Sequence, residues 1–464
     1  MAGHIFAPEI LREYDIRGIV GESLTAHDAF ILGRSLGKLF NGASSKMAVV
    51  GRDGRHSSPY LCEELIHGLS LSGLNVMDIG VVASPMLYFA NHVLKADLGV
   101  MVTGSHNDAG YNGFKMVLHG KSFYGKDIKR LAEIARFGLF ASGYGQVVQT
   151  SINDAYLQRI IADYQGSRFS AKGLRVGWDP GNGAFGPTTK ALTKLLKGTH
   201  FLINDEIDGD FPAHHPDPTI AENLVQLQQL VAANTLDIGI GFDGDGDRIG
   251  LVDDRGRIVW GDQILMLLAK AILPHCPPNS PVIYDVKASN GLGEVLAELG
   301  AKPVMSPTGH SIIKTKMAQL DAPLAGEMSG HIFIKHLYYG YDDALYVALR
   351  LLNFLETSPY KLSELVDQLP KFVNTPELRV DVSEAEKFAL IDKLAEKVAD
   401  YPPQQVNKMD GLRVDETDGW WLVRASNTQP CLVVRCEAKD QAGLDAICNK
   451  LAHYLTQLGI KPPF

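Results

Sequence analysis

Short apolar runs rich in β-branched residues recur along the chain, and each one ends in a loop of glycine and polar residues. The runs and their loops are MAVV before GRDGR (47–55), LGVMV before TGSHND (98–108), LRVGW before DPGNG (174–183), LDIGIGF before DGDGDR (236–248), PVIYDV before KASNG (281–291) and PLAGE before MSGH (323–331). Buried strands that alternate with helical stretches predict an α/β fold with parallel or mixed sheets. Because ligands bind at the carboxyl ends of strands in such sheets, we expect the functional site in these loops.

This alternating pattern is interrupted at three places along the chain, near 140–151, 253–261 and 357–376. The 464 residues alone would predict about three domains at ~150 residues each. The interruptions instead divide the chain into four segments, and the last one reads as an α+β module and not as another βα repeat. The predicted domains are 1–150, 151–256, 257–368 and 369–464.

The composition is that of a soluble globular protein, with 45% hydrophobic and 21% charged residues. A formal net charge of −9 argues against a nucleic-acid-binding surface, which has to be basic. No apolar run is long enough to cross a membrane, and charges near the N-terminus leave no apolar core for a signal peptide. Five cysteines without CxxC spacing argue against a disulfide framework or a structural zinc site, so we expect a cytoplasmic protein.

Asp243, Asp245 and Asp247 alternate with glycine between two apolar strands. Because glycine lets the backbone curl, carboxylates at every second position can converge on one hard cation, without which their mutual repulsion would be costly. The loop is not an EF-hand, since Arg248 occupies the position at which an EF-hand has glycine. Three carboxylates leave positions open for a phosphate oxygen, which suits Mg²⁺. The alternative is a solvated acidic turn, which the flanking buried strands disfavour.

Ser105 lies in the loop 103–107 at the end of another predicted strand, and Lys115 follows a short distance beyond. A serine in a tight loop beside histidine and lysine could act as a nucleophile or as a phosphoryl carrier. A turn of serine and asparagine without a chemical role has the same composition. The motif alone leaves both interpretations open.

Two further polar loops carry groups that suit a sugar phosphate. Glu327 and Ser329 lie two residues apart and could bind vicinal hydroxyls. Arg424 and Arg435, together with the hydroxyl and amide groups that follow Arg424, could form a phosphate cradle. Taken singly, each loop is explained equally well as an ordinary polar turn.

The stretch Gly181-Asn-Gly183-Ala-Phe-Gly186 matches the dinucleotide-binding fingerprint, with Asp205 about twenty residues further on. However, Pro187 lies just inside the start of the predicted helix, and no second unit of this kind follows. We therefore do not expect nicotinamide binding.

Taken together, in this order and spacing, the four polar loops resemble those of the α-D-phosphohexomutase family, and the resemblance extends from Tyr14 to Arg435. The GEMSGH sequence at 326–331 is most like the bacterial phosphomannomutase/phosphoglucomutase branch, whereas phosphoglucosamine mutases usually have GEQSGH. The resemblance implies a heart-shaped molecule in which three related mixed α/β domains and a smaller C-terminal α+β domain surround a central cleft. Each domain would contribute one loop to that cleft.

The resemblance also implies roles for individual residues. Ser105 would carry the phosphoryl group, and an oxygen of that group would complete the Mg²⁺ ligands formed by the three aspartates. Lys115 and His310 would transfer protons, and Arg248 would offset developing charge. The positions implied for binding sugar hydroxyls and the second phosphate are Tyr14, Arg17, Lys287, Glu327, Ser329, His331, Arg424, Ser426, Asn427, Thr428 and Arg435.

The reaction implied by the resemblance is the interconversion of hexose 1-phosphate and hexose 6-phosphate, of mannose or glucose or both, through a phosphoserine. A hexose 1,6-bisphosphate would be the intermediate and the activator. We expect a small-molecule sugar phosphate as the partner, no nucleic acid or membrane partner, and a monomer, with a dimer as the alternative. In place of the family's proline after Ser-His-Asn, this chain has Asp108, which removes a fixed φ and adds a carboxylate.

Three other functions remain open on the sequence. A phosphoglucosamine mutase would use the same loops on an amino sugar. An aspartate-dependent sugar phosphatase would use 243–247 and release inorganic phosphate, and a non-enzymatic sugar-phosphate-binding protein would show no turnover.

Overall fold

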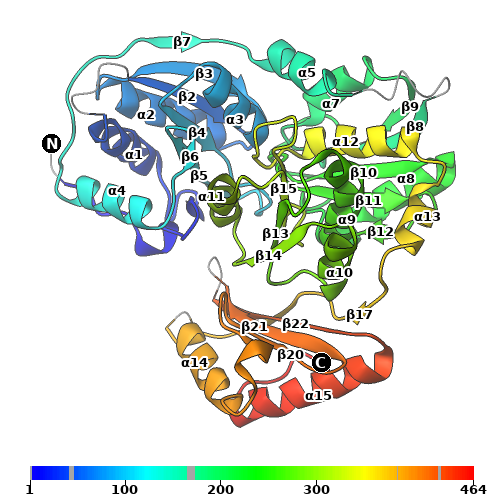
Figure 1. The fold of residues 1–464 in the computed structure, drawn as a ribbon. Coiled ribbons are helices and arrows are strands. Elements are labelled where there is room, and N and C mark those ends of the chain that lie inside the picture. Colours follow the sequence, from blue (N-terminus) through cyan, green and yellow to red (C-terminus); the bar gives the residue numbers. More distant parts are fainter. Residues whose placement is uncertain (1–2, 41–45, 165–172, 384, 427–429) are drawn as a thin grey trace.

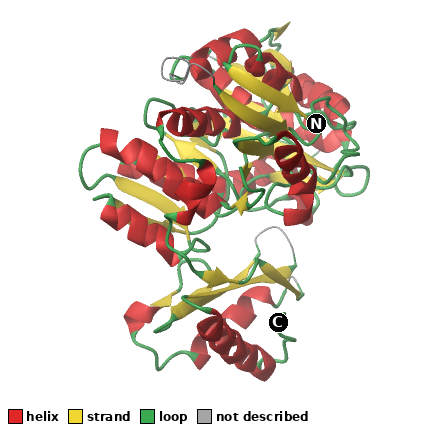
Figure 2. Cartoon of the chain, turned by 90° about the vertical axis from the view of Figure 1, so that its right-hand side faces the viewer, coloured by secondary structure: helices red, strands yellow, loops and turns green. Residues whose placement is uncertain are grey.

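The computed structural model describes residues 3–40, 46–164, 173–383, 385–426 and 430–464. Within these ranges the strands form four sheets. Three sheets with their helices lie next to one another, and the fourth, which comes last along the chain, forms a separate module (Figure 1). That module also stands apart from the other three in the perpendicular view (Figure 2).

The first sheet lies in the N-terminal part of the chain. Its elements are η1 (Pro8–Ile10), β1 (Ile16–Ile19), α1 (Ala26–Lys38), β2 (Met47–Arg52), α2 (Ser58–Ser70), β3 (Asn75–Val81), α3 (Ser84–Val93), β4 (Leu98–Val102), β5 (Tyr111–Leu118), β6 (Lys121–Ser122), α4 (Lys126–Arg136) and β7 (Val147–Gln149). The strand order is β1-β5-β4-β2-β3-β7, with β6 paired to β5. Helices α1, α2 and α4 pack in one core with Val50 and Val100, while α3 packs on the opposite face with Val49 and Met101.

The second sheet has the order β12-β11-β10-β8-β9. Its elements are α5 (Asn153–Ile161), β8 (Leu174–Asp179), α7 (Gly186–Thr193), β9 (Gly198–Leu202), η2 (Ala221–Leu224), α8 (Val225–Asn234), β10 (Ile238–Phe242), β11 (Ile249–Asp253) and β12 (Ile258–Val259). Strand β12 pairs with β11, so this sheet extends three residues past the predicted domain boundary at 256.

The third sheet has the order β14-β13-β15-β16. Its elements are α9 (Gly261–Ile272), η3 (Leu273–His275), β13 (Pro281–Asp285), α10 (Asn290–Glu298), β14 (Lys302–Ser306), α11 (His310–Leu320), β15 (Leu324–Gly326), β16 (Ile332–Ile334), α12 (Ala344–Thr357) and α13 (Leu362–Asp367). An isolated bridge between Arg248 and His331 joins the second and third sheets.

The three sheets repeat one topology. In each, a first strand (β2, β8 or β13) lies parallel to the two that follow it, and the second of these turns back into an antiparallel strand. The turn is the β4–β5 connection in the first sheet, β10–β11 in the second and β15–β16 in the third. These equivalent turns contain the serine loop, the triple-aspartate loop and the GEMSGH loop, so the repeat itself places the three candidate loops.

The fourth sheet is antiparallel throughout and has the order β17-β22-β21-β20-β19, with β18 also paired to β22. Its elements are β17 (Val373–Asn374), β18 (Leu378–Asp381), α14 (Lys387–Lys397), η4 (Pro403–Gln405), β19 (Val406–Asn407), β20 (Leu412–Asp415), β21 (Gly419–Ala425), β22 (Cys431–Ala438) and α15 (Gln441–Gln457). Helices α14 and α15 share a core with it. Trp420 and Leu422 pack instead against Val286 of the third module. The predicted fold class, three related α/β units and one α+β unit, is confirmed.

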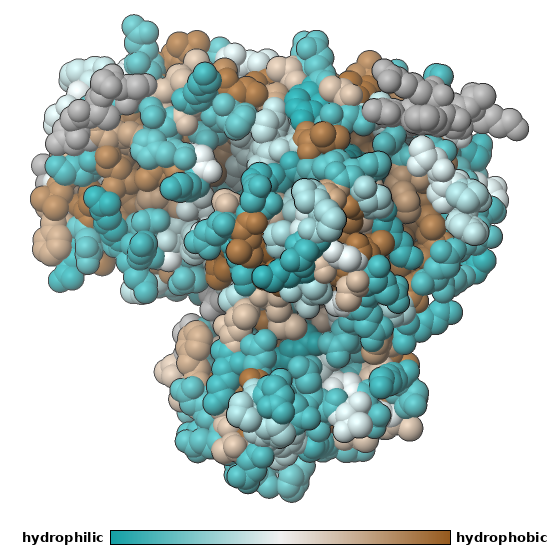
Figure 3. All heavy atoms as spheres, viewed as in Figure 1, coloured by the Kyte–Doolittle hydropathy of each residue, from teal (hydrophilic) through white to brown (hydrophobic). Residues whose placement is uncertain are grey.

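One continuous hydrophobic core runs through the first three modules and includes Met86 on α3, Phe185, Ile240 on β10 and Leu349 on α12, whereas the fourth module has a core of its own. The surface drawn in Figure 3 is largely hydrophilic, with hydrophobic residues in separate groups. No helix in the described ranges has the length and apolar character that a bilayer crossing requires.

Candidate active site

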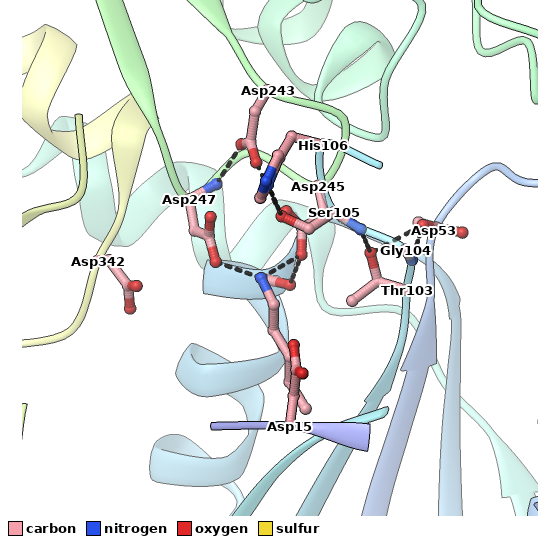
Figure 4. Close-up of polar contacts among 12 residues, drawn as sticks. Asp15, Asp53, Thr103, Gly104, Ser105, His106, Asp243, Asp245, Asp247 and Asp342 are labelled. Atoms are coloured by element: carbon pink, nitrogen blue, oxygen red, sulfur yellow. Dashed lines mark hydrogen bonds and ion pairs between the residues drawn. The ribbon is translucent and has the colours of Figure 1, made fainter. Parts of the chain in front are cut away.

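The serine loop and the triple-aspartate loop meet at the junction of the first two modules. Ser105 is 2% exposed, and its Oγ donates a hydrogen bond of 3.1 Å to Asp243 Oδ2 across 138 positions of sequence (Figure 4). The backbones come equally close: a Cβ on Gly244 would lie 2.6 Å from the carbonyl oxygen of Ser105. The glycine between the first two aspartates is therefore what allows the two loops to touch.

The aspartate loop curls around its own first carboxylate. Asp243 Oδ1 accepts 3.0 Å hydrogen bonds from the backbone N–H groups of Asp247 and Arg248. Gly246 has φ +77°, and a Cβ there would lie 2.3 Å from the ring of Phe185, so only glycine fits. The three carboxylates are fully buried, and one oxygen from each lies within 4.8 Å of the others. The predicted convergence of the three side chains is confirmed.

These carboxylates form a buried acidic group that could hold a metal ion. Burial and the neighbouring carboxylates of Asp247 and Asp245 raise the pKa of Asp243 well above its usual range. No described residue forms a hydrogen bond with Asp245 Oδ1 or Asp247 Oδ1, although both atoms are buried. Buried carboxylate oxygens without donors are costly unless a cation lies beside them. The donor set therefore fits a hard divalent cation.

Lys115 on β5 brings a positive charge to the same group. Its Nζ lies 2.6 Å from Asp245 Oδ2 and is hydrogen-bonded to Asp247. Burial lowers the pKa of Lys115, but the carboxylates of Asp245 and Asp247 outweigh it and raise that pKa well above its usual range. The lysine thus lies where the sequence placed it, as an ammonium inside the acidic group.

Asp53 and Arg55, which follow β2, hold the serine loop in place. Asp53 Oδ2 accepts hydrogen bonds from the Thr103 hydroxyl at 2.8 Å and from the Gly104 N–H at 3.1 Å, and the Thr103 hydroxyl in turn accepts from the N–H of Ser105. The buried Arg55 guanidinium donates to four loop carbonyls. These are the carbonyls of Ser105, Asn107, Asp108 and Tyr111.

These contacts explain how the loop keeps its shape without the family's proline. Ser105 has φ +50°, in the left-handed region that non-glycine residues seldom adopt. The carbonyl of Asp108 is fixed by Arg55 at 2.6 Å, while its carboxylate is largely exposed and lies 3.4 Å from His215 Nδ1 in the second module. Backbone hydrogen bonds to a buried arginine thus replace the restriction that proline would impose.

The GEMSGH loop faces the N-terminal end of α11. Glu327 Oε1 accepts a 2.5 Å hydrogen bond from the N–H of Gly309, and Glu327 N–H donates to the carbonyl of His331 at 2.8 Å. Ser329 is half-buried in the turn. Arg248 Nε donates to His331 Nε2 at 3.0 Å, which connects this loop to the aspartate loop.

Two carboxylates of the fourth module pair with two of the predicted phosphate-binding cations. Arg424 Nε donates to Asp410 Oδ2 at 2.9 Å, and Lys287 Nζ donates to Glu377 at 3.0 Å. The Lys287 ammonium lowers the pKa of Glu377 to about 2. Gly411, at φ +77°, lies so close to Arg424 that a Cβ would be 2.5 Å from its Cα.

The remaining predicted positions lie around the same junction. Tyr14 hydroxyl donates to the carbonyl of Thr308 at 2.7 Å, and Arg17 donates to Asn107 in the serine loop. Arg435 donates to the carbonyl of Lys287. Ser426 is buried at the end of β21. Asn427 and Thr428 lie outside the described residues.

Family models match each of the four modules in turn. The models described as phosphoglucomutase/phosphomannomutase α/β/α domains I, II and III match residues 8–138, 154–256 and 260–372, and the model of the C-terminal domain matches 377–453. The chain belongs to the phosphoglucomutase/phosphomannomutase family. The predicted family is therefore confirmed.

Relatives of the family are similar over nearly the whole chain. A phosphomannomutase/phosphoglucomutase of Pseudomonas putida is 43% identical over 94% of this chain and 93% of its own length. A phosphoglucomutase of Neisseria gonorrhoeae is 40% identical over 95% of both chains. The crystal structure of a phosphoglucomutase/phosphomannomutase family protein from Burkholderia thailandensis has a TM-score of 0.92 at 39% identity, and covers 99% of this chain and 100% of its own.

Within this family fold, the site contains residues that the sequence analysis did not single out. Asp53 and Arg55 were visible only as a polar strand end, GRDGR, like those that carry the other loops. Asp410 precedes a glycine in a turn of ordinary composition, and Asp342 precedes a second aspartate. Their partners lie in other modules or in distant loops, so no local pattern marks them.

The dinucleotide-like loop at 181–186 packs beneath the aspartate loop. Ala184 N–H donates to the carbonyl of Gly244 at 2.9 Å, and a Cβ on Gly183 would lie 2.7 Å from that carbonyl oxygen. These glycines therefore serve a close backbone contact between the two loops.

Proposed function

We propose that the chain interconverts the 1-phosphates and 6-phosphates of mannose and glucose through a phosphorylated Ser105. Membership of the family makes it a hexose phosphate mutase, an isomerase. The observation that supports the serine is its position: Oγ lies 3.1 Å from Asp243 Oδ2, at the edge of the buried acidic group. A serine there is close to a cation-binding set and is held by a rigid loop.

The phosphoryl group of Ser105 passes to the free hydroxyl of the bound sugar phosphate, which yields a hexose 1,6-bisphosphate. This intermediate turns over, and its other phosphate returns to Ser105. Mg²⁺, held by Asp243, Asp245 and Asp247 together with a phosphoryl oxygen on Ser105, would supply charge neutralisation at the group being transferred. Arg248 and the Lys115 ammonium lie beside the same carboxylates and add positive charge.

We assign proton transfer to His310 and Lys115. Burial, reinforced by the nearby Lys314 ammonium, lowers the pKa of His310 well below its usual range. Its imidazole is therefore neutral at pH 7 and able to accept a proton from a sugar hydroxyl.

Substrate binding is assigned to the GEMSGH loop and to the fourth module. Glu327 and Ser329 would hold two sugar hydroxyls that keep their place when the sugar turns over, with His331 in the same loop. The phosphate that is not transferred would bind to the loop that starts at Arg424. Its partners in this proposal are Ser426, Asn427 and Thr428, with Tyr14, Arg17, Lys287 and Arg435 around it.

We also propose a cytoplasmic monomer and a domain division at 150, 256 and 368. All five cysteines are free, as is usual in a reducing compartment. The first three modules share one core, so each divides less cleanly from its neighbour than the fourth module does.

A coupled assay with mannose 1-phosphate and glucose 1-phosphate, with and without glucose 1,6-bisphosphate, tests the activity. Intact mass spectrometry should find a phosphorylated fraction that maps to Ser105. Ser105→Ala should lower turnover at least 1,000-fold, on the order of what a nucleophile contributes. Ser35→Ala is the matched control, because Ser35 is also buried but its Oγ has no hydrogen-bond partner among the described residues.

Wild-type turnover in Ser105→Ala would rule out the phosphoserine route. Net release of inorganic phosphate without isomerisation would identify a phosphatase. Higher turnover of glucosamine phosphates than of the other two sugars would identify a phosphoglucosamine mutase.

A further inference from the structure

Two imidazoles and one carboxylate lie beside the acidic group. The rings of His310 and His331 stack with 5.5 Å between centroids and 17° between planes. Asp342 Oδ2 lies 3.1 Å from His331 Nδ1 and 3.7 Å from His310 Nδ1, so one carboxylate oxygen faces the same nitrogen of both rings. Asp342 and His331 are buried, and the side chain of His310 is only 12% exposed. In Figure 4, Asp342 lies beyond Asp247 as seen from Ser105.

The tautomer of His331 follows from its contact with Arg248. The guanidinium Nε donates to His331 Nε2 at 3.0 Å, and arginine has no acceptor atom. His331 Nε2 must therefore present its lone pair to Arg248, and the ring proton of the neutral imidazole must be on Nδ1. That N–H faces Asp342 Oδ2 and, at 3.5 Å, Asp247 Oδ1.

This assignment also settles how to interpret the three groups Asp247, His331 and Asp342, whose ligand atoms lie within 4.8 Å of one another. A metal ion at that place would need the Nδ1 lone pair of His331. Because Nδ1 carries the proton, the three groups share a hydrogen and do not form a second metal centre.

Asp342 acts on His310 in the same way. Its Oδ2 faces His310 Nδ1, while its Oδ1 is held by Lys314 Nζ at 2.9 Å. A carboxylate that faces Nδ1 favours the tautomer with the proton there. No described residue forms a hydrogen bond with His310 Nε2, so this tautomer leaves the Nε2 lone pair for substrate.

We propose that Asp342 is the positioning residue that keeps both imidazoles in the Nδ1–H form, so that His331 is committed to Arg248 and His310 exchanges the proton of the sugar hydroxyl. The proposal rests on the proposed function for the identity of that hydroxyl. As the O–H bond breaks, its proton moves to His310 Nε2 and the oxygen's electron pair bonds to phosphorus. The bond from phosphorus to Ser105 Oγ breaks and leaves its electron pair on Oγ.

The return transfer runs in the opposite direction. Ser105 Oγ bonds to the phosphorus of the other phosphate, and the sugar oxygen that leaves takes the proton back from His310 Nε2. Asp342 stays ionised throughout and offsets the charge of the imidazolium that exists between the two transfers.

Nitrogen-15 NMR of wild-type enzyme labelled at histidine tests the tautomers without any mutation. The spectra of His310→Gln and His331→Gln identify the two signals by their loss. We expect both rings to show a protonated Nδ1 and an unprotonated Nε2 at pH 7.5. A protonated Nε2 on either ring would overturn the proposal.

Steady-state kinetics of Asp342→Asn test the consequence for the reaction. An asparagine can turn its N–H₂ group toward Nδ1 and so favour the other tautomer, and we expect kcat to fall about 100-fold or more, with KM within about threefold of wild type. Asp343→Asn is the matched control. Asp343 is equally buried, but its carboxylate accepts hydrogen bonds from Tyr156 and Tyr338 and faces neither imidazole.

A kcat of Asp342→Asn within threefold of wild type, or an equal loss in Asp343→Asn, would overturn the proposal. If Asp342→Asn fails to fold, the wild-type tautomers decide. If Ser105→Ala keeps full activity, the phosphoserine route fails, while the two tautomers can still be read from the spectra.

Discussion

Arg55 is the side chain on which we expect the serine loop to depend most. It is 1% exposed, and its five N–H groups donate to Asp53 and to the four loop carbonyls. A lysine keeps the positive charge but has three N–H donors instead of five. In Arg55→Lys at least two buried acceptors therefore lose their donor.

The cost can be worked from these two acceptors. A hydrogen bond from a charged donor to a buried carbonyl contributes about 1.5 kcal/mol, so the loop should lose about 3 kcal/mol of stability against local opening. Since 1.4 kcal/mol is a factor of ten in an equilibrium constant, opening should become about 100-fold more frequent. Hydrogen-exchange mass spectrometry on the peptide 103–112 measures this change directly. Turnover should fall with it, because Ser105 is no longer held in one position.

Arg175→Lys is the matched control. Arg175 lies on β8 in the second module, and its guanidinium donates to the carbonyl of Asn234, away from the serine loop. We expect no change in exchange at 103–112 in this variant. Exchange of that peptide within threefold of wild type in folded Arg55→Lys would refute the reasoning.

Three further predictions concern the metal, pH and backbone. Mg²⁺ at 100 times its Kd should stabilise the wild type by about 2.7 kcal/mol and raise its Tm, but not that of Asp245→Asn; an equal rise in both would contradict the metal site. Because the folded-state pKa of Glu377 is lowered to about 2, its ion pair should stabilise the enzyme above pH 4.5 and lose this effect as pH falls toward 2. The Tm difference between wild type and Glu377→Gln should therefore shrink below pH 4.5, and a constant difference would refute this. Gly246→Ala should cost about 2–4 kcal/mol in thermal unfolding, from its positive φ and the contact with Phe185, and an unchanged Tm would show that the loop rearranges.

The α/β class, the order of the candidate loops and the aspartate cluster could be predicted from the sequence. Each depends on neighbouring residues: apolar runs form buried strands, and glycine between Asp243, Asp245 and Asp247 lets three carboxylates turn to one side. The resemblance added the identity of the site, because four loops in register are more specific than any one of them.

The tertiary structure decided how the loops meet. The repeated strand order brings Ser105 to Asp243 across 138 positions, and it brings His331 to Arg248 across 83. It also supplies the residues that hold the site in place, Arg55 and Asp342, whose partners come from other loops. Such contacts leave no local pattern, because the physical requirement is a buried donor facing a buried acceptor, and folding can meet it with residues from any part of the chain.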